Sequence, residues 1–260
     1  MIRLDGLRKR YGRYEAVRGI DLHVRKGEVF GFLGPNGAGK TTTIKMVAGL
    51  LKPSEGTVRI DGIDTSVDPV GAKRLIGYIP DRPYLYERLT GMEFLAFVGG
   101  VFGMPDAEVA ERGAELLRFF GLGNFGDELV EGYSHGMKQR LTLSAALLHR
   151  PKLLVVDEPM VGLDPAGAML IKKVFREMAE EGNTVFLSTH TLEVAEAICD
   201  RVAIINEGRV ATQGTVEELK ALHTSGGGNL EDVFLELIGS PEDRDVIQVL
   251  RQDHPDQVGR

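Results

Sequence analysis

Short apolar runs recur along the chain, and each is followed by glycine or polar residues. They cover residues 29–33, 153–156, 184–188 and 201–205. Helix-length patterns lie between or after them, at about 39–51, 166–181 and 191–198. A strand that is buried on both faces of a parallel sheet has a continuous apolar sequence, and its connections are usually helical. The alternation therefore predicts an α/β fold with a mainly parallel sheet.

Two regions depart from this alternation. Residues 1–28 and 56–62 contain short strand patterns with glycine turns, which predict an antiparallel β layer beside the main sheet. Residues 88–149 have little strand pattern but contain helix-length patterns, at 92–102, 106–120 and 137–149. We therefore expect one domain of residues 1–225, in which a helical insertion of residues 88–149 divides a core made of residues 1–87 and 150–225.

The end of the chain has a different composition. Gly226–Gly228 predicts a flexible break, and residues 230–238 predict one short helix. From Gly226 onward the chain carries eight acidic and three basic residues, a net charge of −5 out of −7 for the whole sequence. We expect residues 226–260 to form an acidic, partly disordered C-terminal extension.

Composition excludes several classes of protein. Hydrophobic residues make up 43% and charged residues 27% of the chain, which is typical of a folded globular protein. The single cysteine indicates a reducing compartment, and no apolar stretch approaches the ~18 to 20 residues of a membrane span. Because the net charge is negative, we expect no nucleic-acid partner. These features predict a cytoplasmic protein.

A glycine-rich segment joins the first apolar strand to the helix that follows it. It matches the pattern G-x-x-x-x-G-K-[ST], in which backbone N–H groups and a helix N-terminus bind phosphate oxygens. Lys40 is predicted to bridge the β and γ phosphates, and the Thr41 hydroxyl to bind Mg²⁺. The predicted nucleotide-binding residues are Gly34, Pro35, Asn36, Gly37, Ala38, Gly39, Lys40, Thr41 and Thr42.

Two adjacent carboxylates follow the apolar run 153–156. Asp157 is placed at the carboxyl end of a buried strand, where it can bind Mg²⁺. Glu158 is one residue further along and can accept a proton from an attacking water. The alternative, an acidic surface turn before Pro159, does not account for four apolar residues directly before the two acids.

Further motifs make the chain resemble the ATP-binding cassette (ABC) ATPases. The segment 133–141 (Tyr-Ser-His-Gly-Met-Lys-Gln-Arg-Leu) is similar to the family signature, although His135 stands where the family usually has glycine. Residues 162–165 are similar to the D-loop, and 188–190 to the segment that carries the switch histidine. The resemblance implies the following roles: Ser134 and Gly136 bind the γ-phosphate, His190 orients the attacking water, Tyr11 stacks on adenine and Val17 packs against the adenine edge.

The resemblance also implies partners and an activity. It implies an ATPase with the ABC ATPase fold that uses ATP and Mg²⁺ and works as a head-to-tail homodimer, in which Ser134 of one subunit meets the nucleotide held by Lys40 of the other. A separate integral-membrane permease would then place the chain on the inner face of the cell membrane, and the layout resembles bacterial export-type ATPases. The alternative is a soluble ABC-type ATPase that acts on ribosomes or DNA.

One position departs from the family pattern. Asp81 stands where the family usually has a magnesium-sensing glutamine, and aspartate is shorter and charged. The adjoining segment 82–102 is rich in aromatic residues. These side chains either fill the core of the helical insertion or form a cleft for a cytoplasmic helix of the permease. In the second case Asp81 would report the γ-phosphate and Mg²⁺ to that partner.

Overall fold

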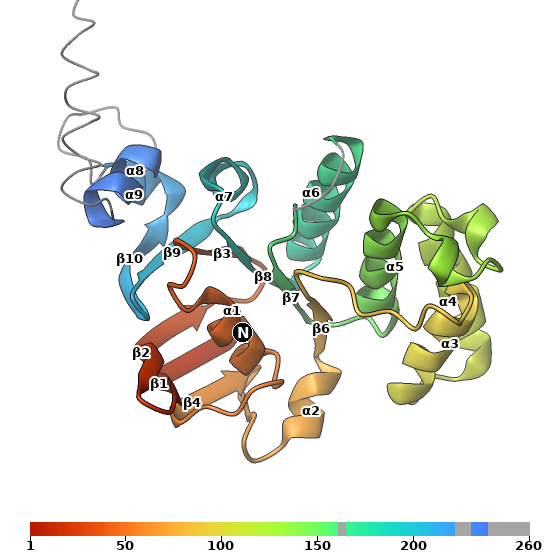
Figure 1. Ribbon diagram of the computed structural model, residues 1–260, viewed down its shortest axis with the longest axis horizontal. Coiled ribbons are helices and arrows are strands. Elements are labelled where there is room, and N and C mark those ends of the chain that lie inside the picture. The colour runs from red at the N-terminus through yellow and green to blue at the C-terminus, as the bar shows by residue number, and fades with distance from the viewer. Residues whose placement is uncertain (161–164, 222–229, 239–260) are drawn as a thin grey trace, which may run out of the picture.

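The computed structural model describes residues 1–160, 165–221 and 230–238 (Figure 1). A six-stranded sheet has the order β10-β9-β3-β8-β7-β6, and all neighbours are parallel except β10 and β9. Every residue of β3, β7 and β8 is buried, as their apolar sequences predict. The predicted α/β class with a mainly parallel sheet is therefore confirmed. The strands are β3 (Val29–Leu33), β6 (Ile76–Ile79), β7 (Leu153–Asp157), β8 (Thr184–Thr189), β9 (Arg201–Asn206) and β10 (Arg209–Thr215).

A second, antiparallel sheet has the order β2-β1-β4-β5 and confirms the predicted β layer. Helix α1 (Lys40–Val47) lies between the two sheets (Figure 1). Its buried Ile44 and Val47 belong to the same apolar cluster as Phe30 and Phe186 of the main sheet. The strands of this layer are β1 (Ile2–Tyr11), β2 (Tyr14–Val24), β4 (Glu55–Ile60) and β5 (Ile63–Asp64).

Helix α1 is shorter than predicted, because it ends at Val47 rather than near residue 51. Gly49 adopts the left-handed conformation (φ +67°), and the backbone N–H groups of Leu50 and Leu51 both donate to the Lys45 carbonyl. A glycine that follows a helix in this way closes it, and this explains the early end.

The helical insertion forms its own small core beside β6 and β7 (Figure 1). Its buried residues include Phe94, Leu117, Leu141 and Leu148. Helix α5 begins earlier than predicted, because Ser134 caps it. The helices between β5 and β7 are α2 (Pro69–Arg74), α3 (Gly91–Val101), α4 (Asp106–Phe119), the 3₁₀ turns Gly123–Phe125 and Val130–Gly132, and α5 (His135–Leu148).

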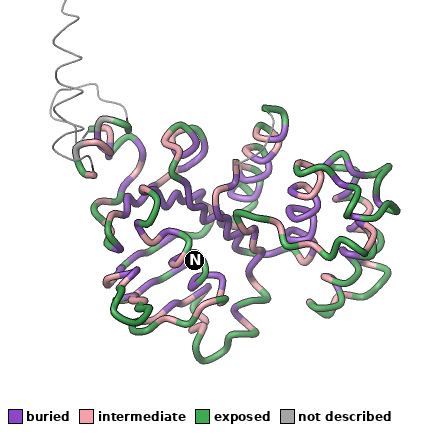
Figure 2. The backbone as a smooth tube through the Cα atoms, viewed as in Figure 1, coloured by how far each residue is buried: buried purple, intermediate pink, exposed green. Residues whose placement is uncertain are grey.

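The last helices show that part of the expected C-terminal extension is folded. Leu230 and Val233 of α9 are buried in the core that also contains α6 and α7, and the Leu230 N–H donates to Glu196 (2.9 Å). Figure 2 shows how burial concentrates in the central strands and the inner faces of the helices. These helices are α6 (Pro165–Glu180), α7 (Leu192–Ile198), α8 (Val216–Ala221) and α9 (Leu230–Ile238). The predicted break at 226–228 and the residues after 238 lie outside the described part.

Within the described ranges, every helix is too short or too polar to cross a lipid bilayer.

Candidate functional site

The loop between β3 and α1 (residues 34–41, hereafter the P-loop) is shaped by close backbone contacts. A Cβ atom on Gly34 would lie 2.3 Å from the Ile205 carbonyl oxygen, and one on Gly39 would lie 2.6 Å from the Ala16 carbonyl oxygen. Gly39 also has φ +104° and is the N-cap of α1 without a side-chain cap. Only glycine fits both positions, and the first N–H groups of α1 are left for a ligand.

Lys40 is the first residue of α1, and its side chain is nearly buried. Its ammonium group donates to the carbonyls of Gly34 (2.7 Å) and Pro35 (3.2 Å) and lies 3.8 Å from Glu158 Oε1. Burial lowers the pKa of Lys40, while the carboxylates of Glu158 and Asp157 act in the opposite direction. The lysine is thus held inside the loop, where it faces both acids.

Asp157 ends β7 and is almost fully buried. Its Oδ1 accepts hydrogen bonds from the Ser188 hydroxyl (2.5 Å) and the Thr41 hydroxyl (3.4 Å). Carboxylate and hydroxyl oxygens are ligands that Mg²⁺ prefers, and Mg²⁺ takes few ligands from protein and the rest from water and phosphate. Thr41 and Asp157 therefore fit a magnesium ion. Ser188 was predicted only as part of a motif, and its contact follows from the pairing of β7 with β8.

Glu158 and His190 lie together at the carboxyl ends of β7 and β8. His190 Nδ1 is 2.9 Å from Glu158 Oε1, and the His190 side chain is half-exposed. Glu158 has a positive φ of 53°, which is uncommon outside glycine, and its N–H donates to the Ser188 carbonyl (3.1 Å). This conformation turns the carboxylate toward Lys40 and His190 rather than along the strand.

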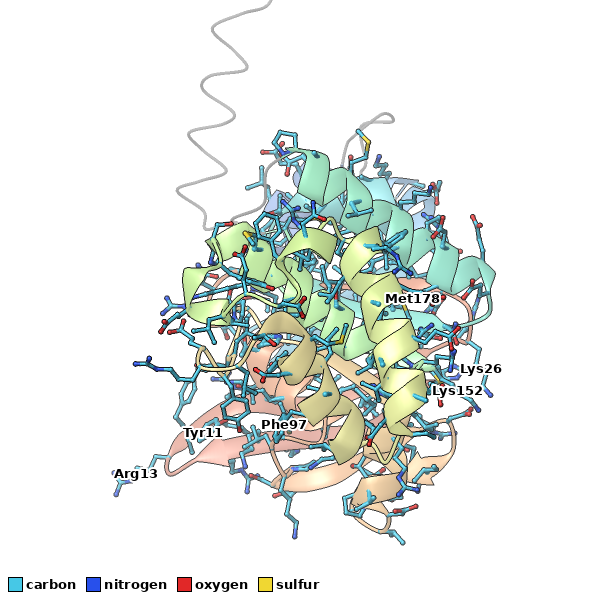
Figure 3. The ribbon with its side chains drawn as sticks, turned by 90° about the vertical axis from the view of Figure 1, so that its right-hand side faces the viewer. Tyr11, Arg13, Lys26, Phe97, Lys152 and Met178 are labelled. Atoms are coloured by element: carbon cyan, nitrogen blue, oxygen red, sulfur yellow. The ribbon has the colours of Figure 1, made fainter. Side chains whose placement is uncertain are left out.

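A cavity of about 320 Å³, the nucleotide cavity, opens beside the P-loop. Tyr11 and Tyr14 face each other across the β1–β2 hairpin, and both line it. The Lys9 ammonium lies over one face of the Tyr11 ring, 5.4 Å from its centroid. Figure 3 shows Arg13 extending outward from the tip of this hairpin. The cavity is lined by Tyr11, Tyr14, Ala16, Asn36, Gly37, Gly39, Lys40, Thr41, Thr42, Asp81 and Glu158.

The position of Val17 differs from the expectation. Its side chain is 0% exposed and belongs to the apolar core between the sheets, so it is not part of the described surface of the nucleotide cavity. Its neighbour Ala16 lines the nucleotide cavity instead, because successive side chains of a strand point to opposite faces. Sequence reasoning missed both Ala16 and Tyr14.

Three predicted residues of the P-loop do not line the nucleotide cavity but make hydrogen bonds through their backbone carbonyls. The carbonyls of Gly34 and Pro35 hold Lys40. Ala38 is buried, and its carbonyl accepts from the Gly208 N–H (2.9 Å), which fastens the loop to the turn between β9 and β10. These residues position the loop for the neighbours that line the cavity.

The signature residues lie in the helical region. Ser134 is exposed, and its hydroxyl accepts from the Met137 N–H at the start of α5 (3.3 Å). A Cβ atom on Gly136 would lie in nearly open space. Among the described residues that line the nucleotide cavity, neither Ser134 nor Gly136 is present. The D-loop residues 162–164 lie outside the described part of the chain.

A second cavity of about 630 Å³, the apolar cavity, lies between the core and the helical region. The aromatic segment contributes both to it and to the helical core. Phe94 is buried and lines the cavity, whereas Tyr84 (86% exposed) lies at its edge. The lining residues are Thr41, Lys45, Ala48, Leu50, Lys73, Ile76, Tyr78, Pro80, Asp81, Arg82, Tyr84, Leu85, Phe94, Val98, Phe102, Thr142, Ala145, Ala146, His149 and Asp157.

Two side chains of this cavity have shifted pKa values. Burial, together with the charges of Asp157 and Asp81, raises the pKa of Tyr78 to about 12, so its phenol stays protonated. Burial lowers the pKa of His149, and the Arg112 charge adds to this. His149 Nε2 lies 3.1 Å from the Ile76 carbonyl, and its ring stacks on Phe102 (3.6 Å between centroids, 10°). A neutral His149 thus joins the end of α5 to β6 and α3.

Comparisons with known proteins assign the fold to a family. The ABC transporter family matches residues 17–161. The uncharacterized ABC transporter ATP-binding protein YxlF of Bacillus subtilis (strain 168) is 39% identical over 258 residues, which cover 99% of this chain and 85% of YxlF. The Nod factor export ATP-binding protein I of Ralstonia nicotianae (strain ATCC BAA-1114 / GMI1000) is 40% identical over 219 residues, 84% of this chain and 68% of that relative.

Solved structures give the same result. An ATP-binding subunit of an ABC transporter superposes with a TM-score of 0.86 at 34% identity, over 91% of this chain and 99% of that one. The dimeric structure of MJ0796, a bacterial ABC transporter cassette, gives a TM-score of 0.75 at 28% identity, over 83% of this chain and 98% of the other. The chain therefore belongs to the ABC transporter family, as an ATP-binding subunit with ATPase activity.

Proposed function

We propose that the chain binds Mg²⁺·ATP in the nucleotide cavity and hydrolyses it with Glu158 as general base. The observation that carries this proposal is the meeting of Lys40, Asp157, Glu158 and His190 at the carboxyl ends of parallel strands, where ligands bind in α/β sheets. Tyr11, which lines this cavity, stacks on the base. The phosphate oxygens accept hydrogen bonds from the backbone N–H groups of the P-loop and of the first turn of α1.

Each polar side chain then has a defined task. The Lys40 ammonium exchanges the carbonyls of Gly34 and Pro35 for phosphate oxygens, with which it makes stronger charge-assisted contacts. Thr41 and Asp157 would hold Mg²⁺, which when bound would neutralise phosphate charge. The Glu158 carboxylate accepts the proton of the attacking water, and His190 fixes its orientation through Oε1.

The signature residues act on the nucleotide of a second copy. Ser134 and the start of α5 form an exposed anion-binding position, and the nucleotide cavity of the same chain does not include it among its described lining residues. A head-to-tail homodimer satisfies both observations, because each α5 N-terminus then faces the other subunit's γ-phosphate. The dimeric structure of the related cassette MJ0796 supports this arrangement.

The partner is a separate integral-membrane permease, so the chain is peripheral on the inner face of the cell membrane. The apolar cavity supports this partner, because an exposed apolar surface beside the site marks an interaction surface. The name of the Nod factor export relative supports export as the direction of transport. Asp81 lines both cavities and is the residue that would report Mg²⁺·ATP to the permease.

The variant Lys40→Ala tests the nucleotide site. Loss of a charge-assisted contact of roughly 1.5 to 3 kcal/mol predicts ATP binding about 10- to 150-fold weaker, and hydrolysis should fall further. Lys152→Ala is the control, because Lys152 is exposed and pairs only with Asp61 at 3.4 Å among the described residues. Binding of a fluorescent ATP analogue and phosphate release are measured on both variants. Wild-type turnover in Lys40→Ala would contradict the assignment.

A further inference from the structure

The lining of the nucleotide cavity is divided into a polar part and an aromatic part. Every amide, aliphatic hydroxyl and charged side chain of its described lining comes from the P-loop, the start of α1 or the segments after β6 and β7. Tyr11, Tyr14 and Ala16 come from β1 and β2 instead, and they contribute two phenol rings and a methyl group. Since the polar part binds the triphosphate on the proposed function, the base of the nucleotide lies against the aromatic part.

The β1–β2 hairpin is fastened to the P-loop. A Cβ atom on Gly39 would lie 2.6 Å from the Ala16 carbonyl oxygen, so the two backbones are in close contact. The turn at Gly208 joins them a second time, because its N–H donates to the Ala38 carbonyl (2.9 Å) and its carbonyl accepts from the Arg18 N–H (2.8 Å). Side chains at the end of the hairpin are therefore held at a defined position relative to the phosphate-binding loop.

Tyr11 and Tyr14 are directly opposite each other in the last pair of the hairpin. Opposite residues project from the same face of an antiparallel pair, and aromatic rings at such positions commonly pack together. Here they do not, because the ring–ring contacts among the described residues join other side chains. Tyr11 remains 50% and Tyr14 57% exposed. Both rings thus keep surface that a third ring can cover.

The Tyr14 side chain has no other task in the described part of the chain. It makes no hydrogen bond, ion pair or ring contact there, whereas the Tyr11 ring has the Lys9 ammonium beside it. Arg13 lies in the turn between the two tyrosines and extends away from the body of the protein (Figure 3). It is not among the described residues that line the nucleotide cavity. Tyr14 is therefore the neighbour of Tyr11 that is placed to meet the same ligand.

We propose that Tyr14 is a second base-binding residue, so that the base of the bound nucleotide contacts the rings of both Tyr11 and Tyr14. The inference rests on the proposed function, since it concerns the nucleotide of that site. The contact depends on the ring of Tyr14 and not on its hydroxyl group, because stacking uses the face of the π system. Tyr14 would thus raise the affinity for the nucleotide without taking part in the chemical step.

A comparison of ATP with ribose 5′-triphosphate, which has no base, isolates this contact. Isothermal titration calorimetry gives the affinity of the full chain for each ligand. Tyr14→Ala should bind ATP about 5- to 150-fold more weakly, as the loss of one base–aromatic contact predicts, and should bind ribose 5′-triphosphate as the wild type does. Tyr14→Phe should keep the ATP affinity within about twofold of the wild type.

Three binding results would overturn the proposal. The first is an unchanged ATP affinity in Tyr14→Ala. The second is an equal loss of affinity for both ligands, which would show that Tyr14 only supports the fold of the site. The third is a loss in Tyr14→Phe as large as in Tyr14→Ala, which would assign the effect to the hydroxyl group.

Arg13→Ala is the matched control, because it changes a side chain of the same turn that does not line the nucleotide cavity. Loss of its positive charge acts on the triphosphate, so the affinities for ATP and ribose 5′-triphosphate should change by the same factor. A selective loss of ATP affinity as large as that in Tyr14→Ala would overturn the proposal, since any disturbance of the hairpin would then be sufficient.

Steady-state hydrolysis separates this inference from the proposed function. A base contact is the same in the ground state and the transition state, so Tyr14→Ala should raise KM for ATP and leave kcat within about twofold of the wild type. A fall in kcat at unchanged KM would overturn the proposal. A wild-type chain that hydrolyses ATP, with a Tyr14→Ala variant of equal ATP affinity, refutes this inference alone. A wild-type chain that fails to hydrolyse ATP refutes the proposed function.

Discussion

Replacing Glu158 by Gln removes one charge and one proton acceptor and preserves the shape of the side chain. Glu158 Oε1 lies 2.9 Å from His190 Nδ1 and 3.8 Å from the Lys40 ammonium, so among the described residues the carboxylate has an imidazole and an ammonium group beside it. Gln can keep a hydrogen bond with His190. It cannot accept a proton from water, because an amide is a very weak base.

The size of the effect follows from these contacts. Loss of a general base slows the chemical step about 10²- to 10⁴-fold, which is about 2.7 to 5.5 kcal/mol in the barrier. ATP affinity should be unchanged or higher in the variant. In the wild type, the Glu158 carboxylate lies 3.8 Å from the Lys40 ammonium, where it competes with phosphate for Lys40 and repels the phosphate charge. The variant should therefore bind ATP and accumulate in the bound state.

Phosphate release and light scattering together test this expectation. With ATP and magnesium, Glu158→Gln should form a dimer that persists, and adding Ser134→Ala should weaken that dimer because the cap from the other subunit is lost. Glu207→Gln is the matched control. Glu207 has a similar positive φ (46°) but is exposed in the turn after β9, so its turnover should equal that of the wild type.

Three results would each contradict a different part of this expectation. Turnover within tenfold of the wild type would show that Glu158 is not the base. Slow turnover by a protein that stays monomeric would agree with Glu158 as the general base but would refute the head-to-tail dimer. If Ser134→Ala does not weaken a stable dimer, Ser134 does not contribute to the contact between the subunits, although the dimer itself is confirmed.

Three further predictions concern the loop, the cavity and their boundary. Gly39→Ala should destabilise the chain by about 1 to 3 kcal/mol more than Gly182→Ala in urea unfolding, because both have positive φ but only the first meets a carbonyl oxygen at 2.6 Å. Burial holds the pKa of His149 below its usual 6.5, so the imidazole binds a proton more readily in the unfolded chain than in the folded one. The free energy of unfolding should therefore fall as the pH drops below about 6.5, and it should fall less in His149→Phe. Asp81→Ala should leave ATP binding intact but abolish the stimulation of ATP hydrolysis by reconstituted permease. Equal stimulation of the variant and the wild type would show that Asp81 does not take part in coupling.

The sequence was sufficient for features that depend on local pattern. The P-loop, the carboxylates at 157 and 158 and the cap at Ser134 each combine a short motif with the end of a strand or helix, and the structure places all of them at those ends. The early end of α1 could also have been predicted, because Gly49 is a typical residue to close a helix.

Features that depend on register were not predictable in the same way. The assignment of Val17 rather than Ala16 to the nucleotide depends on which face of β2 points to the P-loop. The pairing of β1 with β2 shifts register at several places, and each shift of one residue exchanges the two faces. A sequence pattern that places Val17 near the nucleotide cavity therefore cannot decide to which face of β2 its side chain points.

The apolar cavity depends on tertiary contacts that no local pattern reveals. His149 is 73 residues from Ile76 in the chain, yet its ring joins the end of α5 to β6 and to Phe102, the residue that follows α3. Lys45 and Lys73 lie in the last turns of two different helices, and only the folded chain brings them to the same cavity. A run of aromatic residues predicted an apolar surface, but the cations that line the same cavity could be placed only from the fold.

Two side chains line both cavities. Thr41 and Asp81 line both the nucleotide cavity and the apolar cavity, so an occupant of either one is separated from the other by these residues. Thr41 belongs to the proposed magnesium site, and Asp81 follows β6, which His149 fastens to the helical region. On the proposed function, the permease helix and the γ-phosphate would therefore influence each other through direct neighbours rather than through a long chain of contacts. Coupling should then be sensitive to the size and charge of residue 81 and insensitive to substitutions in the distant α8 and α9.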